Sequence, residues 1–383
     1  MTYIYHDQGR NKQQTIVRSY KMNLNRRQFS ALAGATLLSS ALPNLHAEDN
    51  GRRIGYCIVG LGRISMDHFM PATKMSKQSK ITGIVSGHPD KARKMAAEYG
   101  VPERSIYTYE NCDQMRDNKD IDAVYIALPN NMHAEYTIRA AKAGKHVLCE
   151  KPMCTSIADA YAMIDACKQN NVKLLIAYRC QYEPTNLRAI SLIREGKLGT
   201  VQAIESANGF NIRPGEWRLN KKMAGGGPLL DVGIYSLNAC RYLTGEEPAE
   251  VKAYSTTIDH DGRFDQVEEN TSWTMKFPSG IVASCNTTYG ANMNGFYRVH
   301  GSKGTLDVQS AFGYEGQYLK AQFNDKTSLD EPNPAKDPSQ FARMGDYFSN
   351  CILKNEEPKT SGEEGLRDMQ WMSKIYQSCG LSL

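Results

Sequence analysis

The sequence lacks a hydrophobic run of the about 20 residues that a membrane-spanning helix needs. It also lacks internal repeats and low-complexity segments, which excludes a repeat architecture. The rest is an ordinary globular composition, with 41% hydrophobic and 23% charged residues. A chain of 383 residues is long enough for about two domains, each with its own core.

Closely spaced cysteines are missing as well. The ten cysteines are scattered along the chain, and none of them forms a Cys-x-x-Cys pair. This spacing argues against both a zinc-bound module and a scaffold stapled by disulfides. We therefore expect most of the cysteines to be buried thiols, and we predict no metal site.

An excess of positive charge is confined to the N-terminus. The chain carries a formal net charge of +5, and residues 1–47 hold six Lys or Arg against the single acid Asp7. The remainder has 40 basic and 40 acidic residues. Nucleic acids and anionic membranes select a clustered basic surface, so neither is an expected partner. We expect small-molecule partners instead.

Residues 1–47 have the pattern of a twin-arginine (Tat) export signal. Arg26 and Arg27 precede Gln-Phe, a weakly apolar run of about twelve residues follows, and Ala47 ends a candidate cleavage site. Translation from Met22 would give this signal a compact charged head. The Tat machinery exports folded proteins, so a cofactor can be loaded before export. The sequence thus predicts a periplasmic protein.

From Ile54 onward, short apolar runs alternate with helical segments. Strands are predicted at 54–59, 81–85, 123–127, 146–149 and 173–177, and helices at 64–75, 89–99 and 133–143. Such alternation is typical of a parallel sheet covered by helices on both faces. We therefore predict an α/β fold whose first domain, residues 52–178, is a Rossmann domain.

A glycine-rich turn follows the first predicted strand. Its sequence is Gly60-Leu61-Gly62-Arg63-Ile64-Ser65. A turn of this kind between a strand and a helix favours binding of a dinucleotide pyrophosphate at the helix N-terminus.

The end of the second strand bears on which dinucleotide binds. Ser86 stands there, and no carboxylate follows before Asp90, whereas an NAD site places an acid at this point. Ser86 can donate a hydrogen bond, and Lys91 and Arg63 can supply positive charge to a 2′-phosphate. The pattern favours NADP over NAD, with a solvated Lys91 as the alternative.

Two more motifs come directly after strands, at the edge where ligands bind in such sheets. One contains Leu128 and Asn130 and leads to His133, and the other is Glu150-Lys151-Pro152. Both would face the cofactor crevice. We predict that His133 positions the nicotinamide loop, because no second ligand stands nearby for a metal.

In this order, the motifs G-x-G-x-x-S, P-N-x-x-H and E-K-P resemble those of the Gfo/Idh/MocA family of sugar oxidoreductases. The stretches "EWRLNKKMAGGGPLLDVGIYSLN" and "RYLTGEEP" are similar to the glucose-fructose oxidoreductase branch of that family, and the likeness runs from about Gly55 to Gly365. The resemblance implies a second domain, residues 179–383, of the α+β type. Its large, mostly antiparallel open sheet would bind substrate and build homodimers or homotetramers.

Alternating segments in the second half of the chain support such a sheet. They occupy 200–208, 249–258, 270–277, 281–290 and 297–308, and Ser-Gly or Ser-Lys-Gly turns separate several of them. The stretch 325–337, with two prolines, is predicted to be a loop. Residues 361–364 are predicted to form a capping box on the last helix.

Tyr235 stands where many family members carry histidine. Removal of hydride from C1 of a sugar requires a base for the proton of the C1 hydroxyl. The pKa of a free tyrosine is near 10, and an adjacent ammonium, for which Lys151 is the natural candidate, would lower it. Asp231, one helical turn before Tyr235, would orient the substrate or Lys151. The alternatives are a packed tyrosine, a solvated lysine and a helix-capping aspartate.

Trp217 and Arg218 would form a wall of the sugar site by stacking and hydrogen bonding, unless Trp217 belongs to the core and Arg218 to the surface. The predicted catalytic residues are Lys151, Tyr235 and Asp231, and the same three with Trp217 and Arg218 are predicted to bind substrate. The predicted cofactor-binding residues are Gly60, Leu61, Gly62, Arg63, Ile64, Ser86, Lys91, Leu128, Asn130, His133, Glu150, Lys151 and Arg179.

The resemblance implies an NADP-dependent enzyme that oxidises an aldose at C1 to a lactone. Tightly bound NADP would pass the hydride to a second sugar, so that no outside pool of cofactor is needed after export. The alternatives are a periplasmic sugar dehydrogenase or reductase with exchanging cofactor, and an NAD(P)-retaining glycosidase of the same family. A sugar-binding protein with a vestigial nucleotide site is the fourth hypothesis.

Overall fold

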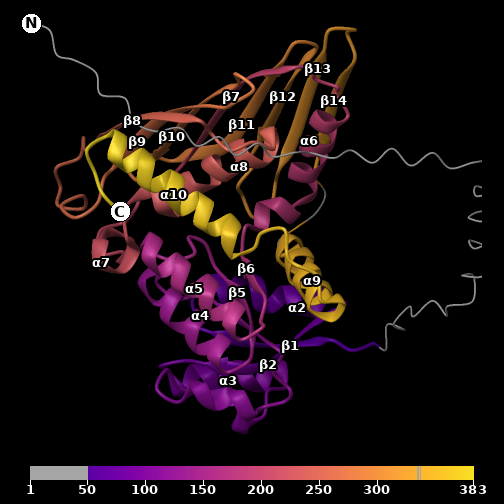
Figure 1. Ribbon diagram of the computed structural model, residues 1–383, viewed down its shortest axis with the longest axis vertical. Helices are drawn as coiled ribbons and strands as arrows, with labels where there is room; N and C mark the ends of the chain where they lie inside the picture. Colours follow the sequence, from indigo (N-terminus) through magenta and orange to yellow (C-terminus); the bar gives the residue numbers. More distant parts are fainter. Residues whose placement is uncertain (1–50, 334–335, 337) are drawn as a thin grey trace, which may run out of the picture. The chain divides into compact units, whose positions relative to one another are not determined.

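The computed structural model describes residues 51–333, 336 and 338–383. The predicted export signal, residues 1–47, lies outside the described residues. The described chain contains two sheets, one of six strands and one of eight, with helices packed against both (Figure 1).

The first sheet is parallel throughout and has the strand order β3-β2-β1-β4-β5-β6. Its strands are β1 (Ile54–Val59), β2 (Ser79–Val85), β3 (Ile106–Tyr107), β4 (Ala123–Ile126), β5 (His146–Cys149) and β6 (Leu174–Ile176). Every residue of β1 is buried, as expected for a central parallel strand with helices on both faces. The predicted Rossmann sheet is confirmed.

Both faces of this sheet are covered. Alternate residues of β1 point to opposite sides, with Tyr56 and Ile58 in one apolar cluster and Cys57 and Val59 in another. The helices of this region are η2 (Ile64–Phe69), α2 (Met70–Met75), α3 (Pro89–Tyr99), η3 (Glu103–Ser105), η4 (Cys112–Asp117), η5 (Asn130–Met132), α4 (His133–Lys142), α5 (Ile157–Gln169), η6 (Arg179–Tyr182) and α6 (Pro184–Arg194).

A helix from the far end of the chain completes one of these layers. The helix α9 (Ser339–Lys354) packs beside α2 and β2 (Figure 1). Its buried side chains Phe341 and Phe348 share an apolar cluster with Phe69 and Tyr125. The domain boundary at residue 178 stays a prediction, and α9 joins the layer that covers the first sheet.

The second sheet has the order β14-β13-β12-β11-β7-β10-β9-β8 and is antiparallel apart from the pair β7–β10. Its strands are β7 (Val201–Gly209), β8 (Glu250–Thr256), β9 (Asn270–Lys276), β10 (Val282–Thr288), β11 (Met293–Gly301), β12 (Gly304–Gln309), β13 (Tyr318–Phe323) and β14 (Ser328–Pro332). The mostly antiparallel open sheet predicted for this half is confirmed.

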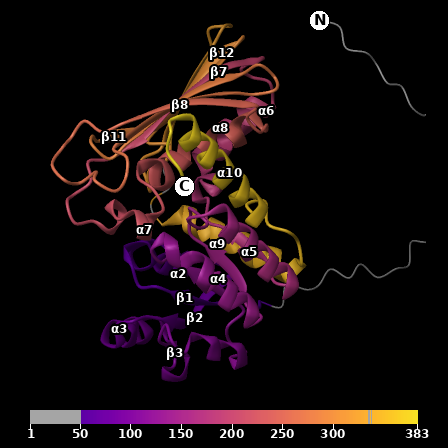
Figure 2. The same cartoon turned by 60° about the vertical axis from the view of Figure 1, so that its left-hand side comes forward.

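Burial alternates along these strands. In β9, Trp273 and Met275 are buried while Thr274 and Lys276 are exposed. The covered face packs on α8 (Ile234–Thr244) and α10 (Gly362–Ser378), and Figure 2 shows α10 running from the sheet toward α5. Two shorter elements, η7 (Trp217–Leu219) and α7 (Lys221–Ala224), lie between β7 and the turn η8 (Leu229–Gly233).

Two local predictions were wrong. The stretch 325–337 is not all loop, because β14 pairs with β13 at the sheet edge. An edge strand tolerates Pro332, since a missing N–H on its outer side leaves no partner unsatisfied. The capping box is also absent: the Ser361 side chain makes no capping bond and its hydroxyl donates to Glu363 Oε2 at 2.8 Å. Glu364 binds Arg241 instead.

All ten cysteines are free thiols, and only Cys379 is not fully buried, in agreement with the prediction of core thiols. Among the residues that the structure describes, none of the helices has both the length and the apolar character to cross a bilayer. The same part of the chain holds no cluster of three or more His, Cys, Asp or Glu that could bind a metal.

Candidate active site

A cleft of about 710 Å³ opens where β1, β4 and β5 end. Its lining includes Gly62 and His68 from the region of the first sheet and Tyr235 and Tyr314 from the region of the second sheet. The carboxyl ends of parallel strands are where ligands bind in open α/β sheets. The cleft therefore lies where the sequence motifs predicted a site.

The glycine turn is built for close approach of a ligand. Gly60 has φ +98°, and a Cβ there would lie 2.6 Å from the main-chain oxygen of Ala127. A Cβ on Gly62 would meet nothing closer than that same oxygen at 3.9 Å. Ser65 supports the turn by donating from Oγ to the Gly60 oxygen at 2.6 Å. Gly60 is thus needed for the fold, whereas Gly62 leaves its space to the cleft.

The first turn of α3, which follows β2, presents a cation to the glycine turn. Lys91 Nζ donates to the main-chain oxygen of Leu61 at 2.6 Å, so Lys91 lies over the glycine turn and is not a solvated side chain of α3. Ser86 is buried, and its Oγ accepts from the amide of His88 at 3.1 Å. The side chain of Asp90 is fully exposed. This arrangement suits a 2′-phosphate better than a ribose hydroxyl that needs an acidic partner.

His133 ties together the loops that follow β4 and β5. Its ring nitrogens lie 2.8 Å from the Pro152 oxygen and 2.9 Å from the Leu128 oxygen. Burial lowers the pKa of His133 to about 4, although the two carbonyl groups act in the opposite direction. Asn130, three positions earlier in the chain, donates to the Ala224 oxygen at 2.9 Å. Both side chains have a positioning role beside the cleft.

The floor of the cleft includes Glu150. It is buried, accepts from the hydroxyl of Tyr125 at 2.6 Å, and takes a weaker bond from the amide of Lys151 at 3.2 Å. Burial raises the pKa of Glu150, against the effect of the Tyr125 hydrogen bond and of the nearby cations.

Asp231 is surrounded by donors. Lys151 Nζ donates to its main-chain oxygen at 2.5 Å and lies 3.3 Å from Oδ1. Arg218 Nε lies 2.9 Å from Oδ2, and the Tyr289 hydroxyl donates to Oδ2 at 2.9 Å. Burial alone would raise the pKa of Asp231, but Arg218, Lys151 and Tyr289 lower it to about 2. Asp231 is therefore an anionic anchor.

The local structure excludes the helix-capping role considered for Asp231. The residue lies inside the π-helical turn η8, whose N-cap is Pro228. The inserted geometry of such a turn is frequent at functional sites. It places the Asp231 carboxylate beside the Lys151 ammonium.

Tyr235 lines the cleft from the first turn of α8. Its ring stacks on Phe312 with centroids 5.6 Å apart, and Lys151 Nζ lies 4.7 Å from its ring centroid. Burial raises the pKa of Tyr235, and the cation that counteracts this is Arg179. The sequence named Lys151 for this part; its ammonium lies over the ring face and contacts Asp231, and its effect on the pKa of Tyr235 stays a prediction.

Arg179 is buried beneath Tyr235, with its Cζ 5.0 Å from the ring centroid. It donates to the oxygens of Phe312 at 2.6 Å and Gly313 at 2.9 Å, and to Gln340 Oε1 at 2.8 Å. Its donors thus hold a loop of the second sheet. The guanidinium reaches the cleft as a charge near Tyr235, while the sequence had placed it at the cofactor.

Trp217 and Arg218 both line the cleft and are half-buried. The Arg218 guanidinium lies 4.7 Å from the Trp217 ring centroid. The alternative of a core tryptophan beside a surface arginine is therefore excluded. Sequence reasoning missed Tyr289, which directly follows β10 as the other site motifs follow their strands.

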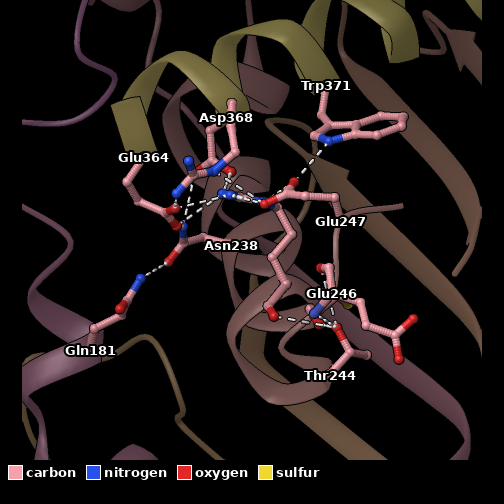
Figure 3. A network of polar contacts seen from close by, with 11 residues as sticks. Gln181, Asn238, Thr244, Glu246, Glu247, Glu364, Asp368 and Trp371 are labelled. Carbon is pink, nitrogen blue, oxygen red and sulfur yellow. Dashed lines mark hydrogen bonds and ion pairs between the residues drawn. The ribbon is translucent and has the colours of Figure 1, made fainter. Parts of the chain in front are cut away.

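A buried polar network connects α8 to η6 and α10 (Figure 3). Asn238, one turn after Tyr235, accepts from Gln181 Nε2 at 2.9 Å and donates to Asp368 Oδ2 at 3.0 Å. Arg241 binds Asp368 and Glu364 of α10 and also Glu247. The network joins η6, which carries Arg179, to the helix that carries Tyr235.

Two consecutive segments of the chain match known domains. Residues 54–178 match the NAD-binding Rossmann fold of the Gfo/Idh/MocA oxidoreductase family, and residues 186–307 match a C-terminal domain of the same family. The chain belongs to the Gfo/Idh/MocA oxidoreductase family. Membership confirms the predicted family and makes the protein an oxidoreductase with an NAD(P)-binding Rossmann domain.

Relatives within the Gfo/Idh/MocA family cover most of the chain. A D-xylose 1-dehydrogenase [NADP(+)] from Haloarcula marismortui is 30% identical over 347 residues, which are 87% of this chain and 92% of that protein. The crystal structure of an aldose-aldose oxidoreductase from Caulobacter crescentus complexed with glycerol is 43% identical, with a TM-score of 0.83. That match covers 87% of this chain and 100% of the other.

A more distant structure shares the fold alone. A levoglucosan dehydrogenase in complex with NADH and levoglucosan is 23% identical, has a TM-score of 0.76, and covers 86% of this chain and 98% of its own. The fold of this chain is thus shared by a protein of quite different sequence.

Proposed function

We propose that this protein is an NADP-dependent sugar oxidoreductase that oxidises an aldose at C1 to the lactone. NADP that stays bound would then return the hydride to a second sugar, which becomes an alditol. The observation that carries the proposal is that one cleft joins the glycine turn to Lys151, Asp231 and Tyr235. The relatives named D-xylose 1-dehydrogenase and aldose-aldose oxidoreductase support a sugar as substrate.

The residues present fit NADP. The main chain at Gly62 is open to the cleft and would receive the pyrophosphate, and Lys91 would meet the 2′-phosphate. His133 holds the two loops that would border the nicotinamide. When bound, NADP supplies the hydride acceptor and donor.

The side chains opposite the glycine turn divide the remaining work. We assign Tyr235, in its ionised form after losing its own proton to solvent, to accept the proton of the C1 hydroxyl at its phenolate oxygen, and Lys151 to hold that hydroxyl in place. Asp231 fixes the direction of the Lys151 ammonium through the 3.3 Å contact at Oδ1. Trp217 would face the sugar ring, and Arg218 is held near it by Asp231.

Burial of Tyr235 opposes loss of its proton, so nearby positive charge matters. Arg179 supplies that charge within 5.0 Å of the ring centroid. A sugar that displaces water from the cleft would strengthen this interaction, because charges attract more strongly at low dielectric constant. The Arg179 charge thus favours the ionised form of Tyr235, which is the form that accepts the proton.

The export signal predicted for residues 1–47 belongs to the same proposal. An enzyme that keeps its NADP needs no external cofactor pool, so it can work in the periplasm after folding and loading in the cytoplasm. We include assembly into a homodimer or homotetramer in this proposal as well, by analogy with the family.

The test begins with the purified mature protein. After denaturation and removal of the chain, the supernatant should contain about one NADP per protein, and the native enzyme should convert an aldose and a ketose or second aldose together without added cofactor. Protein free of NADP that turns over only with added cofactor would indicate an exchanging dehydrogenase. Release of product from an aryl glycoside alone would indicate the glycosidase.

A further inference from the structure

Two aromatic rings from distant parts of the chain meet beside the cleft. His68 lies in η2, directly after the glycine turn, and Tyr314 lies in the loop between β12 and β13. Their ring centroids are 3.9 Å apart and their planes are inclined by 24°, which is a stacked arrangement. Both side chains line the cleft. The stacked pair therefore connects the dinucleotide side of the cleft to its sugar side.

The main chain around Tyr314 is held from below. Arg179 donates to the oxygens of Phe312 and Gly313 at 2.6 and 2.9 Å, and Gln340 Nε2 donates to the Tyr314 oxygen at 2.6 Å. The Arg179 guanidinium also lies 4.5 Å from the Tyr314 ring centroid. These contacts hold the loop that places the Tyr314 ring against His68.

One side of the stacked pair packs on an apolar side chain, and the other side is partly exposed. Phe341 of α9 lies behind it, with ring centroids 5.3 Å from His68 and 6.0 Å from Tyr314. Phe341 is fully buried, whereas Tyr314 is 40% exposed. The rings are thus attached to the core on one side and present their other side to the cleft. A large exposed aromatic in this position is available to cover a ligand.

We propose that the His68–Tyr314 stack is a clasp across the cleft that slows release of the bound dinucleotide. The inference rests on the proposed function, because it takes the ligand to be NADP. A dinucleotide seated on the glycine turn is enclosed on the η2 side for as long as the two rings stay in contact. Parting of the rings removes one aromatic contact and opens that side.

The experiment uses the mature protein loaded with NADPH, whose fluorescence reports the bound state. After addition of excess NADP, the fluorescence decay gives the dissociation rate without any sugar. We expect Tyr314→Ala to raise this rate roughly three- to tenfold, the range of one aromatic pair. Tyr314→Phe keeps the ring and should release NADPH at nearly the wild-type rate. Tyr254→Ala, at an 81% exposed tyrosine of β8, is the matched control.

A structural defect is separated from loss of the clasp by the melting temperature of each nucleotide-free variant. Without nucleotide, the melting temperature of Tyr314→Ala should be close to that of the wild type. Addition of NADPH should raise it by less than it raises the melting temperature of the wild type. The double variant with His68→Ala should release NADPH no faster than His68→Ala alone, because each change breaks the same contact.

An unchanged dissociation rate in Tyr314→Ala would overturn the clasp, as would a Tyr314→Phe variant that behaves like Tyr314→Ala. Rapid release from the wild-type protein is a different result. It would contradict cofactor retention in the proposed function, while the ratio of the variant and wild-type rates would still test the clasp.

Discussion

The ammonium of Lys151 and the carboxylate of Asp231 lie 3.3 Å apart, although 80 positions separate them in the chain. Lys151 follows β5 of the first sheet, and Asp231 lies in the π-helical turn before α8. The contact joins the two halves of the cleft. It makes the site a product of both sheets, and its charges suggest the first experiment.

Asp231→Asn removes the charge that faces Lys151 and Arg218 while keeping the shape of the side chain. We expect kcat to fall by about 10- to 100-fold and the KM for sugar to rise, because a buried charge pair loses one partner. Steady-state kinetics with each sugar will measure both, and bound NADP serves as the control. Unaltered kinetics would show that Asp231 has no role in the reaction.

The same variant has a predictable effect on acid stability. Because the pKa of Asp231 is lowered to about 2, its contribution to stability is present above its unfolded value of about 4 and is lost as the pH falls toward 2. Asp231→Asn should lack that part of the pH dependence in urea unfolding. Parallel curves for the two proteins would contradict the assigned pKa.

Tyr235→Phe removes only the hydroxyl, and the stack on Phe312 can remain. We expect kcat to fall by about 10²- to 10⁴-fold with NADP still bound. Since burial raises the pKa of Tyr235, the wild-type kcat/KM should keep rising with pH through the neutral and mildly alkaline range. The variant should lack this slope. A plateau below pH 8 in the wild type would point to another base.

Arg179→Lys is the companion to Tyr235→Phe, because it keeps the positive charge that opposes the raised pKa of Tyr235. In Arg179→Lys, kcat/KM should still rise over the same alkaline pH range, but its values should be lower than in the wild type. Arg179→Gln should move the rise to higher pH. The two variants lose similar hydrogen bonds to Phe312 and Gly313, so their difference isolates the charge.

The two glycines of the turn should respond differently to alanine. Gly60→Ala places a Cβ 2.6 Å from the Ala127 oxygen at φ +98°, and should cost about 1–3 kcal/mol of unfolding free energy or more. Gly62→Ala meets no protein atom within 3.9 Å, so its stability should stay within about 0.5 kcal/mol of wild type. Its affinity for NADP should nevertheless fall about tenfold or more. Thermal unfolding and nucleotide titration separate the two effects, and equal stability losses would contradict the comparison.

Arg241 is the cation of the network behind α8, and three carboxylates surround it. Arg241→Met leaves these acids without their main counter-charge and should destabilise the fold by about 3–5 kcal/mol in urea unfolding.

Burial raises the pKa of Asp368 to about 6, so its ionised form opposes folding as the pH rises from about 4 through 6. Asp368→Asn should therefore gain stability relative to wild type over that interval. Urea unfolding of both proteins at pH 4.5 and 7 is the measurement. If the wild type instead gains stability relative to Asp368→Asn at the higher pH, the raised pKa is contradicted.

Local sequence signals were enough to predict much of the secondary structure in the first half of the chain. The predicted bounds of α3 and β5 coincide with the structure. In α3, Pro89 stands at the start and Gly100 follows the end with φ +70°, so both boundaries are marked by residues that favour them locally. The glycine turn and the motifs after β4 and β5 could be placed for the same reason.

The second sheet was harder to predict in detail. Its strands show alternating burial, but alternation does not say which strands are neighbours. The parallel pair β7–β10 joins residues about 80 positions apart, such as Ala203 and Val282, and no turn marks it. The strand β14 was missed because its proline and acids are typical of loops, while its place at the sheet edge tolerates them.

Among the site residues, those inside motifs were found and those outside were not. Lys151, Asp231 and Tyr235 stood out in the sequence, whereas Tyr289 was marked only by its place directly after β10, and Tyr314 is a single aromatic in a loop. Arg179 was assigned to the cofactor because it follows a strand, and the structure shows its donors bound to Phe312, Gly313 and Gln340.

The sequence by itself determined most strands of the first sheet, the glycine turn, the family and the residue types available for chemistry, because each of these depends on neighbours close along the chain. Only the tertiary structure decided how those residues act together. It binds Lys151 to Asp231, places Arg179 beneath Tyr235 and stacks His68 on Tyr314. Charge, burial and ring contacts depend on distances in space, and the packing of the two sheets sets those distances.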